Sequence, residues 1–226
     1  FLGAVSHDLR APLRHVTSYG TLVRELLQDA VAASSALPAG GSQEDLREAL
    51  GFLATMDQSA RRMGQMLDGL LALDRAARAP LQLAWQPLAA MVDQVRTALE
   101  AAAPPASPFA PVVVWDVSPA LPRLWADATL LGELLTQLLG NALKFSRTQD
   151  QPQLWVLPEQ AEPGWVAFSV RDNGVGFDPA RASRLGEIFQ RLHREAEFSG
   201  VGTGLTLCRQ IAARHGGRLE ITAQPE

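Results

Sequence analysis

The chain has 226 residues, a hydrophobic fraction of 47% and a formal net charge of −4 at pH 7. This apolar content is enough for a packed core. The sequence has no run of about 18 apolar residues and no signal-peptide pattern, so we expect no direct membrane contact in this segment. An acidic balance without a basic block argues against nucleic acid as the main partner. The single cysteine, Cys208, excludes an internal disulfide framework and favours a reducing compartment.

Residues 1–34 predict one long helix. Apolar residues recur with gaps that alternate between three and four, as in the a/d seam of a helix packed lengthwise on others: Leu2, Val5, Leu9, Pro12, Val16, Tyr19, Val23, Leu26 and Ala30. His7 lies about 200° around the helix from the seam, at roughly 100° per residue. Its imidazole therefore points outward, and Asp8 is also off the seam. Taken alone, His7 is compatible with an ordinary solvated histidine.

A cluster of helix-breaking residues at 37–42 precedes a second helical repeat. Ser42 is a suitable N-cap for it. Its apolar positions again alternate by three and four: Leu46, Ala49, Leu53, Met56, Ala60, Met63, Leu67 and Leu70. Two such helices form a hairpin, and one hairpin buries both seams poorly. We therefore expect a symmetric dimer with a four-helix bundle; the alternative is that the rest of the chain covers both stripes.

Pro80 marks a boundary, so we expect a helical hairpin domain at 1–79 and a second domain at 80–226. The pattern of the second domain predicts strands at 81–85, 112–115, 153–157, 165–171 and 219–222, and helices at 87–102, 127–145 and 203–215. Mixed strands with helices against one face predict an α+β sandwich of two layers. Because the chain begins inside a helical repeat and stops after one strand, we expect a fragment of a longer protein.

Four clusters in the second domain are suited to nucleotide chemistry. Gln137, Asn141 and Lys144 share one helix face, where amide oxygens suit Mg²⁺ and an ammonium suits phosphate; a solvated polar face is the simpler alternative. Residues 172–177 follow a strand, and their glycines allow close approach of a ligand, although a plain turn explains them equally. Residues 200–205 enter a helix whose free amides attract phosphate. Residues 188–192 form an apolar patch within the long stretch between these two glycine-rich clusters, and such a stretch is typical of a mobile lid.

In this order and spacing, five motifs resemble the transmitter core of a bacterial sensor histidine kinase. They are SHDLRAPL at 6–13, QLLGNALKFS at 137–146, DNGVGF at 172–177, IFQRL at 188–192 and GVGTGL at 200–205. The resemblance covers nearly the whole chain. It implies a dimerisation and histidine-phosphotransfer hairpin followed by a catalytic ATP-binding domain of the Bergerat type. The residues of the fourth motif are similar to those of phytochrome-like members of the family.

The resemblance implies a role for each matching position. His7 corresponds to the phospho-accepting histidine, and Asp8 to the adjacent acid that takes the Nδ1 proton and leaves Nε2 as nucleophile. Asn141 corresponds to a magnesium ligand and Lys144 to a phosphate contact. The remaining ATP-binding positions are the adenine-amine reader Asp172, the pocket glycines Gly174 and Gly176, the lid residue Arg191, and the hinge and phosphate-facing segment with Gly200, Gly202, Thr203, Gly204 and Leu205.

Two positions depart from the family pattern. Gln137 stands where the family usually has a first asparagine; its amide oxygen can still bind the metal, with a longer reach. In gyrase-like ATPases an acid at this position activates water, and because a neutral amide cannot act as that base, Gln137 favours transfer to histidine over hydrolysis. Ala11 stands where many relatives carry threonine or asparagine to position a dephosphorylating water, so we expect weak phosphatase activity.

The sequence therefore predicts a homodimeric protein-histidine kinase core of a two-component system, with ATP and Mg²⁺ as cofactors. It would phosphorylate His7 and pass the phosphoryl group to an aspartate of a response-regulator receiver domain. An upstream sensory domain is expected outside this chain. The segment is expected in the cytoplasm, in a protein that is either soluble or membrane-anchored. Two alternatives stay open: a catalytically degenerate signalling scaffold, and a Bergerat-fold ATPase, which Gln137 and the His7–Asp8 pair disfavour.

Overall fold

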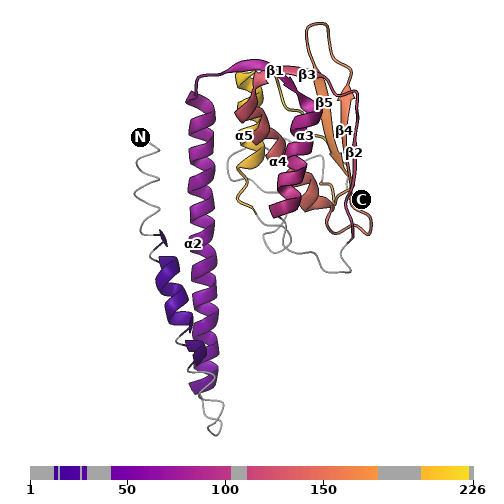
Figure 1. Cartoon of the computed structure of the whole chain (residues 1–226). Helices are drawn as coiled ribbons and strands as arrows, with labels where there is room; N and C mark the ends of the chain where they lie inside the picture. The colour runs from indigo at the N-terminus through magenta and orange to yellow at the C-terminus, as the bar shows by residue number, and fades with distance from the viewer. Residues whose placement is uncertain are drawn as a thin grey trace. The chain divides into compact units, whose positions relative to one another are not determined.

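The computed structural model describes residues 13–14, 16–25, 27–29, 42–102, 111–177 and 200–223. The chain divides into two compact units, Phe1–Asp74 and Arg75–Glu226 (Figure 1). Helix α2, Ser42–Arg78, runs without a break through this division. The domain boundary that the sequence places at 79/80 stays a prediction.

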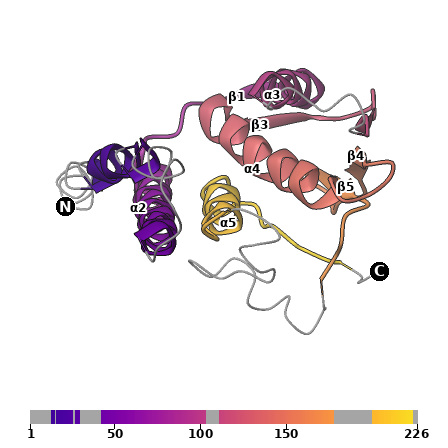
Figure 2. The same ribbon diagram turned by 90° about the horizontal axis from the view of Figure 1, so that it is seen from below.

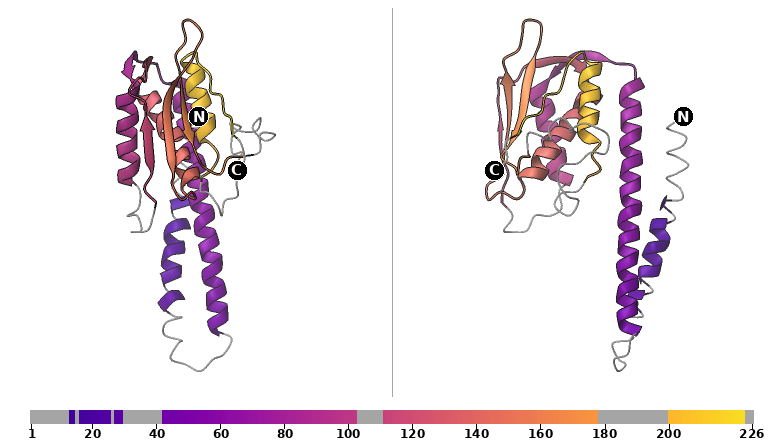
Figure 3. Two further views of the ribbon diagram at one scale, coloured as in Figure 1. Left: turned by 90° about the vertical axis from the view of Figure 1, so that its right-hand side faces the viewer. Right: turned by 180° about the vertical axis from the view of Figure 1, so that it is seen from behind.

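The first unit contains two helical segments. The described residues between 13 and 29 are helical, as is the part of α2 in this unit, and the two segments lie side by side (Figure 3). Arg24 Nη1 lies 3.6 Å from Asp57 Oδ2 on α2, and Arg61 contributes a second ion pair at 3.0 Å. The pair between Arg24 and Asp57 joins the two segments, as expected for a helical hairpin.

The apolar seam of the hairpin is exposed over part of its length. Its exposed members include Val16, Tyr19, Val23, Met56 and Met63, and Phe52, which is not one of the predicted seam positions, is exposed as well. At about 100° per residue, the three on α2 lie within about 40° of one another, so they form one stripe. Within the described residues nothing covers this stripe.

The second unit is a two-layer α+β sandwich, as the sequence predicts. Strands β2 (Val114–Val117), β4 (Gln153–Glu159) and β5 (Ala167–Asp172) form a sheet in the order β2-β4-β5, with β2 parallel and β5 antiparallel to β4. Helices α3 (Leu88–Ala102), α4 (Ala128–Ser146) and α5 (Gly204–Arg214) lie on one side of this sheet. Helix α4 runs between α3 and α5 (Figure 2). The core between the layers includes the fully buried Leu88, Leu135, Leu139, Leu154, Val156 and Ile211.

Strands β1 (Leu83–Pro87) and β3 (Arg123–Asp127) form a separate antiparallel pair. Trp85 lies opposite Trp125 in this ladder, and their rings make an edge contact with centroids 5.5 Å apart. Strand β3 is not among the predicted strands, because its segment RLWAD runs directly into Asp127, the N-cap of α4. The sequence prediction placed β1 two residues early, since pairing with β3 decides where the ladder begins.

The structure corrects two further strand predictions. Strand β2 begins at Val114, because the expected first residue, Val112, is 84% exposed and pairs with no described strand. Residues 219–222 are not a strand. Their burial alternates as in a strand, but they make no ladder with a described neighbour, and side-chain alternation without backbone pairing does not fix a strand.

The start of α4 is fixed by Asp127, as the sequence predicts. Its Oδ1 accepts from Thr129 and Leu130 N–H at 3.0 and 3.1 Å, and its Oδ2 accepts from Gln82 N–H at 2.8 Å. These bonds lower the pKa of the Asp127 carboxyl, the one from Gln82 most, while burial acts in the opposite direction. The Asp127 N–H donates to His215 Nε2 at 3.0 Å, which joins the start of α4 to the end of α5.

The end of α5 also follows the sequence prediction. Gly216 has φ +74°, and the Gly217 N–H donates back to Ala212 O at 2.8 Å, as in a glycine-terminated helix. Arg214 donates to Ala76 O at 2.7 Å, close to the C-terminal end of α2. None of the described helices has both the length and the apolar composition needed to cross a membrane.

Candidate functional site

The polar row of α4 is partly withdrawn from solvent. Gln137, Asn141 and Lys144 are all half-buried, although a freely solvated face would expose such side chains. The Lys144 Nζ lies 4.3 Å from the centre of the Phe145 ring, within the range of a cation–π contact. The row therefore faces another part of the protein rather than open water.

The glycine-rich segment 200–204 lies against this row. A methyl group built on Gly200 would be 3.6 Å from Lys144 Nζ, and one built on Gly204 would overlap Gln137 Oε1. Gly200 and Gly202 have φ of +131° and +79°, a region that favours glycine. The polar row of α4 and the glycine-rich segment thus meet, although about 60 residues separate them along the chain. The sequence singles out both of these clusters.

Helix α5 begins at this segment. Thr203 is its N-cap residue and makes no side-chain capping bond, and Leu205 follows in the first turn. Cys208 is fully buried, and its Sγ donates to Leu134 O at 3.7 Å, which ties α5 to α4. Burial raises the pKa of the Cys208 thiol to about 12, so it is a packing group and not a reactive thiolate.

The turn after β5 lies against the other end of α4. A methyl group on Gly174 would be 2.6 Å from both the carbonyl carbon and oxygen of Phe145, so the backbones approach too closely for any side chain. The Val175 N–H donates to the same oxygen at 3.4 Å. Gly176 has φ +58°. This turn therefore needs its glycines for space as well as for conformation.

Asp172 stands at the end of β5. Its Oδ1 accepts from the Gly174 N–H at 2.9 Å. Although the residue as a whole is exposed, surrounding atoms withdraw the carboxyl from water and raise its pKa; the bond from Gly174 opposes this effect. A carboxylate so held presents its remaining acceptor capacity to an external donor.

Sequence reasoning missed the role of Asn173. Its Oδ1 accepts from Gln153 N–H at 2.8 Å, and its Nδ2 donates to Gln151 O at 2.9 Å. Its own N–H donates to Gln153 O at 3.3 Å. The side chain thus joins the turn after β5 to the start of β4. The sequence offers one clue, a polar residue within a glycine-rich motif, but this clue does not predict which backbone groups the side chain binds.

Several predicted site residues lie outside the described residues. These are His7, Asp8 and Arg191, together with Ala11 and the expected lid. The roles assigned to them stay predictions.

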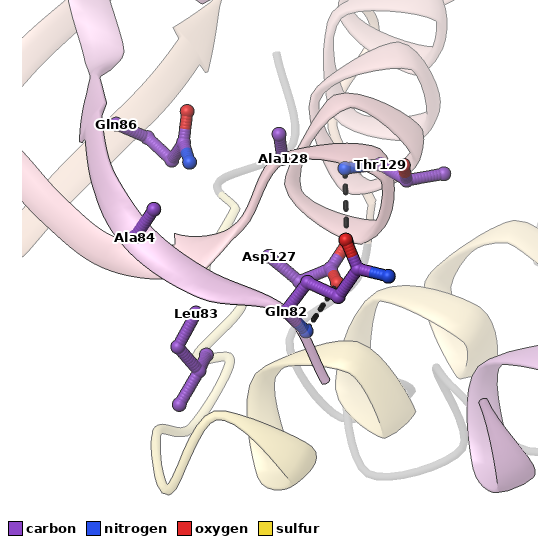
Figure 4. A pocket seen from close by; sticks show the side chains of 7 residues that line it. All are labelled: Gln82, Leu83, Ala84, Gln86, Asp127, Ala128 and Thr129. Carbon is purple, nitrogen blue, oxygen red and sulfur yellow. Dashed lines mark hydrogen bonds between the residues drawn. The ribbon is translucent and has the colours of Figure 1, made fainter. Parts of the chain in front are cut away.

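A hollow of about 360 Å³ opens at the N-terminal end of α4 (Figure 4). It is lined by Gln82, Leu83, Ala84, Gln86, Asp127, Ala128 and Thr129. Its carboxylate is already engaged in capping α4, and the polar row of α4 begins ten residues further along. This hollow is therefore not the candidate site.

The described residues contain no group of three or more His, Cys, Asp and Glu side chains that could hold a metal. A cation at the polar row would have to use the amide oxygens of Asn141 and Gln137. Mg²⁺ fits this set, because it commonly takes one or two protein oxygens and completes its shell with waters and phosphates.

The comparisons with known proteins agree with one another. Residues 126–226 match the model of the "Histidine kinase-, DNA gyrase B-, and HSP90-like ATPase" family. The chain is 31% identical to cyanobacterial phytochrome A of Nostoc sp. (strain PCC 7120) over 99% of its own length and 26% of that protein's. It is 27% identical to the adaptive-response sensory kinase SasA of Synechocystis sp. (strain PCC 6803), over its whole length and 55% of that protein's.

The fold has a solved counterpart. The structure of the histidine kinase ThkA in complex with the response regulator protein TrrA matches with a TM-score of 0.52 and 15% identity, over 95% of this chain and 54% of that one. The chain thus spans between a quarter and just over half of the length of these three proteins. Residues 126–226 match the histidine kinase-, DNA gyrase B- and HSP90-like ATPase family, and the chain as a whole is similar in sequence and fold to sensor histidine kinase cores, phytochrome-like members included.

Proposed function

We propose that this chain is the kinase core of a two-component system, which transfers the γ-phosphoryl group of Mg-ATP to His7. The observation that carries the proposal is the meeting of three segments at α4: the polar row on the helix, the glycine-rich segment that starts α5, and the glycine turn after β5. Separately each has an ordinary explanation. Together they form a place where amides, an ammonium and a carboxylate converge.

The nucleotide would lie across these segments. Asp172 would accept a hydrogen bond from the adenine amine, with Gly174 and Gly176 leaving room for the ring. Lys144 and the glycine-rich segment would hold the phosphates, the segment through its backbone amides. The amide oxygens of Asn141 and Gln137 would hold Mg²⁺, which neutralises phosphate charge when bound. Arg191 would contribute a further charge.

The chemical step would use the His7–Asp8 pair. With its proton on Nδ1, the imidazole offers the Nε2 lone pair to the γ-phosphorus. A bond forms between Nε2 and phosphorus, the bond to the β–γ bridging oxygen breaks, and ADP leaves with its electron pair. Asp8 takes the Nδ1 proton and neutralises the ring. Catalysis would consist mainly of positioning and charge stabilisation.

The proposed function also predicts the binding partners of the chain. The exposed stripe on the hairpin would form the homodimer, because a second copy offers the same apolar stripe across a two-fold axis. The phosphoryl group would pass to an aspartate of a response-regulator receiver domain, a proposal supported by the fold shared with ThkA, whose structure contains such a partner. A sensory domain would supply the input, and the core would work in the cytoplasm.

The proposal is tested by incubation with γ-labelled ATP and Mg²⁺, followed by mapping of the modified residue. We expect acid-labile, base-stable label on His7. His7→Gln should abolish labelling and leave nucleotide affinity nearly unchanged, whereas Asp172→Asn should weaken nucleotide binding itself. Label that persists on another residue in the His7 variant would disprove the acceptor assignment. Absence of nucleotide binding in the presence of Mg²⁺ would favour the signalling scaffold with a degenerate nucleotide site, which Gln137 keeps open as a second candidate.

A further inference from the structure

Gly204 is a glycine for lack of space, not for its backbone conformation. It is the first residue of α5, and its φ is not in the positive range that Gly200 and Gly202 occupy. An alanine would therefore adopt this backbone without strain. A methyl group at this position would, however, overlap Gln137 Oε1 and lie 3.4 Å from Gln137 Cδ and 3.9 Å from Asn141 Nδ2. The amide of Gln137 occupies the volume that a side chain would need.

This contact depends on the length of the side chain at position 137. An asparagine has one methylene group fewer, which would draw its amide back by about 1.5 Å, the length of one carbon–carbon bond. Such a side chain would leave the space beside Gly204 unfilled. The glutamine and the glycine are thus matched in size across the contact between α4 and α5.

The contact lies where the glycine-rich segment needs support. Thr203 gives α5 no side-chain cap, and two of the four preceding residues are glycines with positive φ. At the other end of the segment, Gly200 lies beside Lys144. With Gln137 over Gly204, the polar row of α4 contacts the segment at both ends.

We propose that Gln137 is a positioning residue that fixes the glycine-rich segment and the start of α5 by filling the space over Gly204. The proposal rests on the function proposed above, since this segment is the part expected to hold the phosphates. It differs from a purely metal-binding role for Gln137, because the effect on nucleotide passes through the backbone of residues 200–204.

A double-mutant cycle on the nucleotide-free protein tests the matched pair. Gly204→Ala alone should lower the unfolding midpoint, because the methyl group displaces the amide. In the Gln137→Ala or Gln137→Asn background the same change should leave the midpoint unchanged or raise it, since alanine is the better helix former once there is room. Gly132→Ala is the control. This glycine lies on α4, as Gln137 does, and a methyl group there would make only a 3.9 Å contact to Met91, so the change should shift the midpoint equally in all backgrounds. Equal effects of Gly204→Ala in every background would overturn the proposal.

Nucleotide affinity separates positioning from metal binding. Gln137→Ala should weaken ATP binding several-fold both with Mg²⁺ and with EDTA, and Gly204→Ala should reproduce this loss while the glutamine is still present. Gln137→Asn combined with Gly204→Ala should recover affinity relative to Gly204→Ala alone. A loss confined to Mg²⁺ conditions would reject positioning in favour of a metal ligand. If positions 137 and 204 are coupled in the unfolding midpoint but the unmutated chain binds no ATP, the two side chains are still matched in size. That result would reject both the proposed function and the role of Gln137 toward nucleotide.

Discussion

Single residues at the candidate site differ in how strictly the fold constrains them. The contact at Gly204 is with the end of the Gln137 side chain, which can be displaced at the cost of its packing. The contact at Gly174 is with the backbone of Phe145 in the last turn of α4, which yields less readily than the end of a side chain. Gly174 is therefore the stricter position, although both glycines belong to motifs that look alike in the sequence.

This difference gives a prediction for Gly174→Ala. A methyl group 2.6 Å from the Phe145 carbonyl must push the turn away from α4 and move Asp172, whose Oδ1 is also 2.6 Å from that position. We expect ATP affinity to fall at least tenfold, about 1.4 kcal/mol or more, as measured by calorimetric titration. Gly132→Ala is the control, because its methyl group has room and alanine stabilises a helix interior by up to about 1 kcal/mol. Unchanged affinity in Gly174→Ala would show that the turn does not contribute to the site.

At the scale of elements, the start of α4 joins three parts of the second unit. Asp127 caps the helix, receives the Gln82 amide at the beginning of β1, and is itself joined to His215 through its N–H. His215 Nδ1 lies 2.8 Å from Ile211 O, so the ring proton sits on Nδ1 and Nε2 is free to accept. The end of α5 is thus held at the start of the helix that carries the polar row.

The same carboxylate gives the second unit a defined dependence on acid. Because its hydrogen bonds lower the pKa of Asp127 below the ordinary 3.8, the unfolded chain binds this proton more readily. The stabilisation is fully present above about pH 3.8 and is lost as pH falls through the lower folded value. Asp127→Ala should cost roughly 1 kcal/mol at neutral pH, a usual value for a lost N-cap. The difference from the unmutated chain in chemical unfolding should shrink below that pH; a constant difference would contradict the assignment.

The elements that the sequence predicts correctly are those whose pattern is local. Helices α2 to α5 follow from apolar periodicity, with Asp127 and Gly216 marking two of the ends. Strand ends depend on pairing with distant residues, so β1 and β2 are shifted, β3 is missed and the strand expected at 219–222 does not form. The glycine and polar motifs predict which segments belong to the site, but the contact between Gln137 and Gly204 needs the packing of α5 on α4.

At the scale of the whole molecule, the exposed stripe on the hairpin is an apolar surface that none of the described residues covers. Large apolar side chains in one row are costly in water, and Met56 is 52% exposed in the middle of α2. The neighbouring Asp57, by contrast, is buried and ion-paired with Arg24, so the two helices of one hairpin meet on a different side of α2 from the stripe.

We therefore expect Met56→Glu to separate the dimer without unfolding the second unit. A carboxylate in the stripe would face its symmetry mate across the two-fold axis, where repulsion adds to the lost apolar contact. Light scattering after size exclusion should give the mass of one chain for Met56→Glu and of two for the unmutated protein. Gln58→Glu is the matched control: it adds the same charge about 200° around the helix, at roughly 100° per residue, and should stay dimeric. ATP affinity should be unchanged in both variants, because the second unit has its own core. A dimeric Met56→Glu protein, or an unmutated chain that is monomeric, would show that this stripe is not the dimer interface.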